Sequence, residues 1–387
     1  MKIAILSPIG RSGTPEHGGI ETVVRNLANE FARQGHGVDL LVYPPPGREP
    51  TVGAVDPSVN IERLHAQHKR TLVKALSRYA RHRHPDVILA ASHRANMVAC
   101  RARSQLRQPV KVYVSEHNTV SAGIKDDGPL KRWHRLHQIR SAYGRADAVV
   151  AVSRGVAEDL HKRVGIAPAL IRVIYNPIVT DEMERLAAHA LDHPWFAPSQ
   201  PPVILGVGRL APQKDFGTLI RAFAQLRRNR LCRLVILGEG KERQHLETLT
   251  RSLGISGDVD MPGFAENPFP YMRHATVLAL SSAFEGFANV VAEALAVGTP
   301  VAATDCPHGP REILEDGRYG ALSPVGDPDT LARAIQTTMS SPPDGALLRA
   351  RAKTFSSAAI AQRYLSLFAD RTESASPASQ GSALPLR

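Results

Sequence analysis

Two glutamates, Glu285 and Glu293, stand eight residues apart where their carboxylates could bind a ligand. Eight residues are a little over two helical turns, so in a helix both side chains would lie near one face. A strand-like apolar run ends just before Glu285, and Gly286 lets the backbone approach a ligand closely. The helix expected after it would direct its first N–H groups toward an anion. This combination suits a sugar attached to a diphosphate.

The alternative is that both glutamates are ordinary polar residues of an amphipathic helix. The surroundings of Glu293 favour a functional role, because residues 290–297 are otherwise small or branched and apolar. An unpaired charge would be costly to bury there. The sequence therefore indicates that Glu293 has a polar partner.

Two cations, Arg209 and Lys214, lie five residues apart on a segment that follows the strand-like run Val203 to Val207. Cations on a loop at the carboxyl end of a strand can close on the two phosphates of a diphosphate. Each charge-assisted hydrogen bond contributes roughly 1.5–3 kcal/mol. A pair of merely solvated cations is the alternative.

Further candidates follow other predicted strands. Gly18 and Gly19 directly precede an amphipathic helix and could bring backbone N–H groups close to a negative ligand, although an ordinary turn has the same pattern. They form no Gly-x-Gly-x-x-Gly fingerprint, which weakens a nicotinamide-binding interpretation. His117 ends a strand and could donate a hydrogen bond to a sugar hydroxyl, or be structural. Residues 305–312 would reach the same cleft or cap a helix.

The elements that position these residues alternate between strands and helices. Helical patterns such as 20–33, 216–228, 241–253 and 328–338 separate most of the apolar runs, as in a parallel sheet covered by helices. The alternation occurs twice, so we predict an α/β protein with two parallel-sheet domains and a ligand at the carboxyl ends of both sheets. The predicted strands are 3–6, 38–43, 87–90, 110–114, 148–152, 172–174, 203–207, 234–237, 277–280 and 300–303.

The domain boundaries follow from this division. We predict one domain over residues 1–177 and a second over 178–356, with a hinge near Asn176 and Pro177. A helix at about 357–370 is expected to pack back on the first domain. Residues 372–387 are rich in Ser, Ala and Pro and are predicted to be disordered.

Length and composition limit the class of protein. A chain of 387 residues, 43% hydrophobic and 22% charged, is typical of a soluble globular protein of two domains. Three widely spaced cysteines support neither a disulfide framework nor a zinc site. The apolar runs are far shorter than the roughly 18 residues of a membrane span, and the N-terminus reads as a strand. We expect a cytoplasmic location.

The formal charge of +12 is concentrated in the first half, where residues 1–199 carry 28 Lys and Arg against 18 Asp and Glu. Segments 67–84 and 131–145 place apolar and aromatic residues among many basic ones. Such segments can bind an anionic membrane surface, at about 1 kcal/mol per basic residue. A solvated basic face is the alternative. No motif supports nucleic-acid binding.

The combination resembles family 4 of the retaining glycosyltransferases, which have the GT-B fold of two Rossmann-like domains facing across a cleft. The likeness extends to about Asp370 and is most specific in the C-terminal half, which is similar to members that use UDP-hexoses or UDP-N-acetylhexosamines to build surface polysaccharides and lipid-linked oligosaccharides. The residues that match the family's motifs are Gly18, Gly19, Glu21, His117, Arg209, Lys214, Glu285 and Glu293.

The resemblance implies a role for each residue. Arg209 and Lys214 would hold the diphosphate, and Glu293 would accept hydrogen bonds from the ribose hydroxyls. Glu285 would hold the transferred sugar, together with the backbone of Gly286, Phe287 and Ala288, while His117 would contact that sugar from the other domain. Gly18 and Gly19 would let the N-terminal loop approach the phosphates and the acceptor.

The first domain would then bind a saccharide or lipid-linked acceptor and the second a UDP-sugar, with the enzyme peripheral on the inner face of the plasma membrane. The cations could stabilise the leaving diphosphate electrostatically, so we expect no metal or other cofactor. Ala288 and Asn289 stand where many members have Gly and a Leu-Pro pair, which leaves the transferred sugar open. The acceptor, the linkage and the oligomeric state are open too. A nucleotide-sugar epimerase on the same fold and a non-catalytic basic binding protein are the alternatives.

Overall fold

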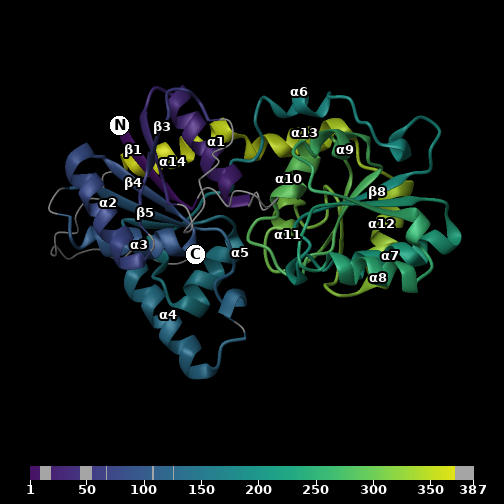
Figure 1. Cartoon of the computed structure of the whole chain (residues 1–387), viewed down its shortest axis with the longest axis horizontal. Helices are drawn as coiled ribbons and strands as arrows, with labels where there is room; N and C mark the ends of the chain where they lie inside the picture. The colour runs from purple at the N-terminus through teal and green to yellow at the C-terminus, as the bar shows by residue number, and fades with distance from the viewer. Residues whose placement is uncertain (9–18, 44–54, 67, 107–108, 125, 371–387) are drawn as a thin grey trace, which may run out of the picture.

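A computed structural model describes residues 1–8, 19–43, 55–66, 68–106, 109–124 and 126–370. Two parallel sheets, each covered by helices, form two halves of the molecule that lie side by side (Figure 1). This arrangement confirms the predicted α/β fold with two parallel-sheet units. The carboxyl ends of the strands are where the predicted site residues of both halves lie.

The first sheet has seven strands in the order β3-β2-β1-β4-β5-β6-β7, and every neighbouring pair is parallel. Its central strands are apolar and almost fully buried because helices cover both faces of the sheet. The strands are β1 (Lys2–Ser7), β2 (Gly37–Val42), β3 (Asn60–Arg63), β4 (Val87–Ala91), β5 (Lys111–Glu116), β6 (Ala148–Ala151) and β7 (Ile171–Val173).

The second sheet has six parallel strands in the order β10-β9-β8-β11-β12-β13. In both sheets the strand order reverses beside the first strand, and ligands of open parallel sheets bind outside the carboxyl ends at such a point. The strands are β8 (Val203–Val207), β9 (Arg233–Leu237), β10 (Val259–Gly263), β11 (Val277–Leu280), β12 (Val301–Thr304) and β13 (Ala321–Ser323).

The four helices predicted from periodicity are present within two residues of their expected bounds, as α1, α7, α8 and α12. The helices are α1 (Gly19–Arg33), α2 (Lys69–Arg83), α3 (His93–Arg103), α4 (Pro129–Tyr143), α5 (Arg154–Asp159), α6 (Met183–Ala187), α7 (Phe216–Asn229), α8 (Arg243–Ser252), α9 (Phe269–His274), α10 (Asn289–Ala296), α11 (Pro310–Ile313), α12 (Pro328–Ser340), α13 (Gly345–Ala352) and α14 (Ser357–Ala369). Short turns of 3-10 or π helix are η1 (Ala122–Ile124), η2 (Leu160–Val164), η3 (Pro168–Leu170), η4 (Pro194–Phe196), η5 (Pro212–Lys214), η6 (Ser256–Asp258) and η7 (Lys353–Phe355).

Three strands, β3, β10 and β13, were not predicted, and each lies at an edge of its sheet. Their side chains are largely half-buried or exposed, in contrast to the continuous burial of the central strands. An edge strand packs against one neighbour only and needs no long apolar run. The absence of such a run is why the sequence pattern missed them.

The last helix, α14, crosses back from the second half to the first (Figure 1). Its ring Phe368 packs against Tyr113 of β5 at 4.8 Å and against Phe31 of α1 at 5.9 Å between centroids. The chain passes between the halves twice, once before the second sheet and once before α14. These two segments meet at a parallel β-bridge between Val179 and Ser356. The core of the first half therefore includes residues from the end of the chain.

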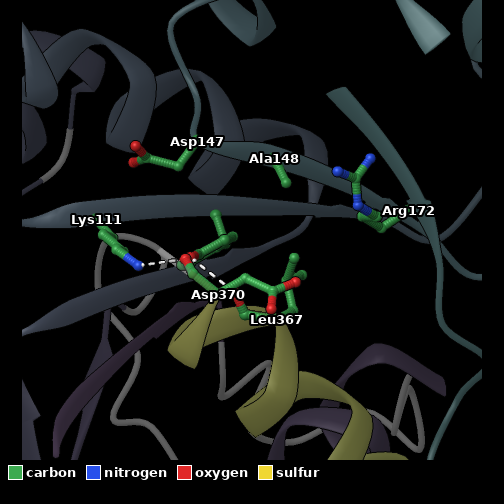
Figure 2. Close-up of a pocket in the computed structure, with 7 residues that line it drawn as sticks. Lys111, Asp147, Ala148, Arg172, Leu367 and Asp370 are labelled. Carbon is green, nitrogen blue, oxygen red and sulfur yellow. Dashed lines mark hydrogen bonds between the residues drawn. The ribbon is translucent and has the colours of Figure 1, made fainter. Parts of the chain in front are cut away.

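The end of α14 is fixed at the amino ends of β5 and β6 (Figure 2). The Lys111 ammonium donates hydrogen bonds to the carbonyls of Phe368 and Asp370 at 3.0 and 2.9 Å, beside a recess of about 230 Å³. This recess lies at the amino ends of the strands, whereas the predicted site residues lie at the carboxyl ends. The hydrogen bonds of Lys111 beside it anchor α14 to the sheet. The predicted disordered tail, residues 372–387, lies outside the described residues.

Candidate active site

The loop after β8 runs beside the loop after β11 and is hydrogen-bonded to it. The Ala283 N–H donates to the Gln213 carbonyl at 2.8 Å, and the Gln213 side chain donates to the Phe284 carbonyl at 3.0 Å. The Ser281 hydroxyl donates to the Lys214 carbonyl at 2.8 Å. These bonds fix the two loops that carry the predicted cations and Glu285 as one unit.

Within this unit, Lys214 and Glu285 form an ion pair. The Lys214 Nζ lies 2.6 Å from Glu285 Oε1, and the Ser282 hydroxyl donates to the same oxygen at 2.7 Å. The side chains are 20% and 9% exposed, so the pair is shielded from water. Gly208 makes room for it, because a Cβ there would lie 3.1 Å from the Cε of Lys214. The proposed phosphate cation and the proposed sugar carboxylate thus contact each other.

Arg209 lies on the same loop but is exposed. Its side chain makes no hydrogen bond or ion pair with any other residue in the described part of the chain. The two predicted cations are therefore unequal: one is held inside the protein, and the other is available to an anionic ligand.

Glu293 lies within α10, whereas Glu285 lies in the loop that precedes this helix. The Glu293 side chain is half-buried, and among the described residues it has no hydrogen-bond partner. Burial raises the pKa of this carboxyl to about 7, an effect that the nearby Lys214 charge partly opposes. The polar partner expected for Glu293 is not a residue of the described protein, which fits a carboxylate that binds a ligand hydroxyl.

His117 follows β5 and meets the second half of the molecule at Gly286. A Cβ at Gly286 would lie 1.9 Å from the His117 carbonyl oxygen, so only glycine allows this approach. The Thr119 hydroxyl donates to the Glu285 carbonyl at 3.4 Å beside it. The sequence-predicted residues His117, Gly286 and Glu285 are therefore brought together from opposite halves.

The His117 ring is buried, and neither ring nitrogen makes a hydrogen bond within the described residues. Burial lowers the pKa of the imidazole to about 4. The ring is neutral near pH 7 and carries one N–H donor and one acceptor nitrogen. It is suited to a hydrogen bond with a neutral hydroxyl rather than to a phosphate charge.

Gly19, the first residue of α1, lies against Asn289, the first residue of α10. A Cβ at Gly19 would lie 2.7 Å from Asn289 Nδ2, and this amide donates to the Gly19 carbonyl at 3.2 Å. The Asn176 amide, at the predicted hinge, donates to Asn289 Oδ1 at 2.7 Å. Asn289 thus joins the two halves, a role that the sequence did not indicate. Gly18 lies outside the described residues.

The side chains of Phe287 and Ala288 are buried in the protein. The Phe287 ring packs against Tyr175 and Phe355 at 5.5 and 5.3 Å between centroids. Ala288 caps α10 in the left-handed conformation, with φ at 66°. Any contact of these two residues with a donor would therefore be made by their backbone, as the sequence comparison with the family implied.

Glu312 is a second contact between the halves that was not predicted. Its carboxylate accepts hydrogen bonds from the backbone N–H groups of Arg154 and Gly155 at 2.9 and 3.0 Å. The His308 ring fills the space that a side chain at Gly155 would need, since a Cβ there would lie 1.9 Å from its Nδ1. Segment 305–312 also pairs with Glu285, whose N–H donates to the Pro307 carbonyl at 2.8 Å. The segment reaches the same contact zone as His117.

Two Asp-x-Asp triplets occur, at 258–260 and 327–329, and both make structural contacts. Asp258 is paired with Arg227 at 2.8 Å and Arg233 at 2.6 Å, and Asp327 caps α12. No group of three His, Cys, Asp or Glu side chains in the described ranges is placed to hold a metal ion. None of the described helices combines the length and apolar character needed to cross a membrane.

Comparisons with known proteins account for both halves. Residues 17–182 match a family model described as Glycosyltransferase Family 4, and residues 190–355 match one described as Glycosyl transferases group 1. The chain is 29% identical, over 92% of its length and 96% of the relative's, to the lipopolysaccharide core biosynthesis glycosyltransferase LpsE of Rhizobium meliloti.

The chain is a glycosyltransferase with the GT-B fold. The HepE protein of Anabaena, solved in complex with UDP, supports this fold with a TM-score of 0.73 at 22% identity over 95% of this chain and 99% of that one. The transferase is also 34% identical, over 51% of its length and 52% of the relative's, to the N-acetylgalactosamine-N,N'-diacetylbacillosaminyl-diphospho-undecaprenol 4-alpha-N-acetylgalactosaminyltransferase of Campylobacter jejuni. A glycosyltransferase identity displaces the epimerase and the non-catalytic binding protein as alternatives.

Proposed function

We propose that this glycosyltransferase moves a hexose or N-acetylhexosamine from a UDP-sugar to a saccharide or lipid-linked acceptor, with retention of anomeric configuration, in the synthesis of a cell-surface glycan. The observation that carries the proposal is the arrangement of Lys214, Glu285 and the Glu293 carboxyl, which has no hydrogen-bond partner among the described residues, opposite a neutral His117 from the other half. The HepE complex with UDP supports the donor class. The diphospho-undecaprenol substrate in the name of the Campylobacter relative and the lipopolysaccharide core biosynthesis in the name of the Rhizobium relative support the acceptor class.

The donor would bind mainly to the second half. Arg209 and Lys214 hold the diphosphate, and Glu293 accepts hydrogen bonds from the ribose hydroxyls. Glu285 and the backbone of residues 286–288 hold the transferred sugar, while His117 donates its N–H to a sugar hydroxyl. As the family resemblance implies, Gly18 and Gly19 would let the N-terminal loop approach the phosphates and the acceptor.

Chemically, the C1–oxygen bond to the diphosphate breaks with its electron pair leaving on the phosphate. The acceptor oxygen forms a bond to C1 on the same face, and its proton passes to the departing phosphate oxygen. The sugar is oxocarbenium-like between these events. Arg209 and Lys214 stabilise the charge that develops on the diphosphate, which is electrostatic catalysis. We propose that this step needs no metal ion.

The acceptor class also favours a place for the reaction. We propose that the enzyme is cytoplasmic and peripheral on the inner face of the plasma membrane, where its basic first half meets anionic lipid. That half carries a net charge of +10 over residues 1–199. Anionic headgroups attract such a surface within about a Debye length.

The proposal is tested with a panel of nucleotide sugars. A donor that binds the folded protein raises its melting temperature by mass action, so one UDP-sugar and UDP itself should stabilise it while the corresponding GDP compounds should not. The selected donor is then incubated with lipid-linked acceptors, and the anomeric configuration of the product is read by NMR. No stabilisation by any UDP compound would contradict the donor class, and inversion at C1 would contradict retention.

A further inference from the structure

The outer half of α4 carries the two most exposed large apolar side chains in the described part of the chain. Leu130 is 79% exposed and Trp133 is 64% exposed. They stand three residues apart on a helix, so they share a face. Figure 1 shows α4 projecting away from the body of the first half. An apolar pair at such a projecting end is an unusual exposure for a polar helix.

The rest of α4 is held firmly, so this tip has a fixed position. Ile139, Ala142 and Tyr143 are buried in the core, and the Tyr143 hydroxyl donates to Glu116 at 2.6 Å. The turn before the helix is tied to it as well, because Asp127 pairs with Lys131 and Arg135. Leu130 and Trp133 are therefore presented to the outside by a rigid base.

The charged residues of α4 itself are all basic, and Asp127 in the turn before the helix pairs with two of them. Helix α4 contains no acidic residue in its 15 positions, and its basic residues are Lys131, Arg132, Arg135 and Arg140. The Trp133 ring stacks on His137 at 5.6 Å between centroids. Trp favours the headgroup level of a bilayer, and basic residues favour anionic headgroups. An anionic lipid surface satisfies both preferences together.

Helix α2 offers a comparison on the same half. It is basic too, but its large apolar residues Leu72, Val73, Leu76 and Tyr79 are all buried in the core. Helix α2 can therefore attract anionic lipid by its charge, but it has no exposed large apolar side chain to insert into the bilayer. The apolar part of the interaction is confined to α4.

We propose that the outer half of α4, residues 129–137, docks on an anionic phospholipid bilayer and inserts Leu130 and Trp133 at the boundary of headgroups and acyl chains. Insertion of such a helix face reaches about 5–10 Å into the interface. This inference rests on the proposed function, since it brings the acceptor-binding half to the surface that holds a lipid-linked acceptor.

The test uses the full chain and vesicles of phosphatidylcholine with or without phosphatidylglycerol. The chain has two Trp, so a W195F variant leaves Trp133 as the sole tryptophan reporter. Vesicles with phosphatidylglycerol should shift its emission to the blue, and acyl chains brominated near the headgroup should quench it. L130S and W133S should each weaken binding about tenfold. The matched control is L231S, whose leucine is 56% exposed on the second half and which should bind normally.

Three outcomes overturn the proposal: no binding of the wild type to either vesicle at low salt, normal binding by L130S and W133S, or a Trp133 spectrum that does not change on binding. Loss of binding in a K74E/R78E variant of α2 with retention in W133S would assign the surface to α2 instead. Transfer to a water-soluble acceptor is measured beside these assays and should be unchanged in W133S. A failure of transfer in the wild type would count against the proposed function and leave the vesicle result standing.

Discussion

The Lys214 ammonium lies 2.6 Å from the Glu285 carboxylate, on a loop that also presents Arg209 to solvent. A diphosphate bound there would share the Lys214 charge with Glu285. The Arg209 charge, in contrast, would pair with the diphosphate alone. The two cations should therefore differ in what their removal does to stability, although both serve the same ligand.

Removing either cation should lower kcat/KM on the order of 10- to 100-fold, the effect of one lost charge-assisted hydrogen bond. K214A should also lower the free energy of unfolding by about 1–3 kcal/mol, because it leaves the buried Glu285 carboxylate without its cation. R209A should leave that free energy within about 0.5 kcal/mol of the wild type. Steady-state kinetics and urea unfolding measure the two effects, with the exposed R230A as control. Equal stability of K214A and R209A would contradict the paired arrangement.

Protonation of Glu293 should make donor binding depend on pH. Its pKa is raised to about 7, so the carboxylate that accepts ribose hydrogen bonds is lost as the pH falls below 7. UDP affinity should therefore rise from pH 6 to pH 8 in the wild type and be lower and flat in E293Q, as titration calorimetry can measure. Identical pH profiles of E293Q and the wild type would exclude Glu293 from the donor site.

Glu293 should also make the free energy of unfolding depend on pH, in a direction that its raised pKa determines. Since the folded pKa of about 7 lies above the ordinary value of 4.5, folding takes up a proton between these pH values. The contribution of Glu293 to stability is present below pH 4.5 and is lost as the pH rises through 7. Relative to the wild type, E293Q should gain stability across this window, measured by urea unfolding at each pH. A constant difference would show that Glu293 titrates normally.

His117 should affect the sugar and not the phosphates. H117A should lower kcat about tenfold or more and leave the dissociation constant of UDP unchanged, because the residue lies on the other half from the phosphate cations. Its imidazole pKa of about 4 means that no His117 titration should occur between pH 5.5 and 8. An H117N variant keeps a neutral donor and should recover part of the rate. A large loss of UDP affinity in H117A would contradict this role.

A methyl group at Gly286 should separate the two halves. It would lie 1.9 Å from the His117 carbonyl oxygen, a backbone atom, so the two segments would have to move apart. G286A should lower kcat/KM at least about tenfold and raise the radius of gyration in small-angle scattering. G257A is the control, since nothing lies within 4 Å of a Cβ at Gly257. Wild-type kinetics of G286A would show that this contact is not made during turnover.

Much of the fold was predictable because a central parallel strand must be apolar along its whole length. The candidate residues were predictable for a related reason: Arg209, His117 and Glu285 each come just after such a strand. The contacts of Glu312 with Gly155 and of Asn289 with Asn176 were not predictable. Their partners are more than 100 residues away in sequence, and no local pattern distinguishes a contact between halves from an ordinary helix cap.

The crossing of α14 back to the first half has a consequence for how the protein is made. Phe31 and Tyr113 pack against Phe368, which is synthesised more than 250 residues after Tyr113. The second sheet has all its strands once Ser323 has been added. The core of the first half, in contrast, stays incomplete until α14 has been synthesised. Although domains generally fold in order from the N-terminus during synthesis, the N-terminal half of this enzyme should complete its folding last.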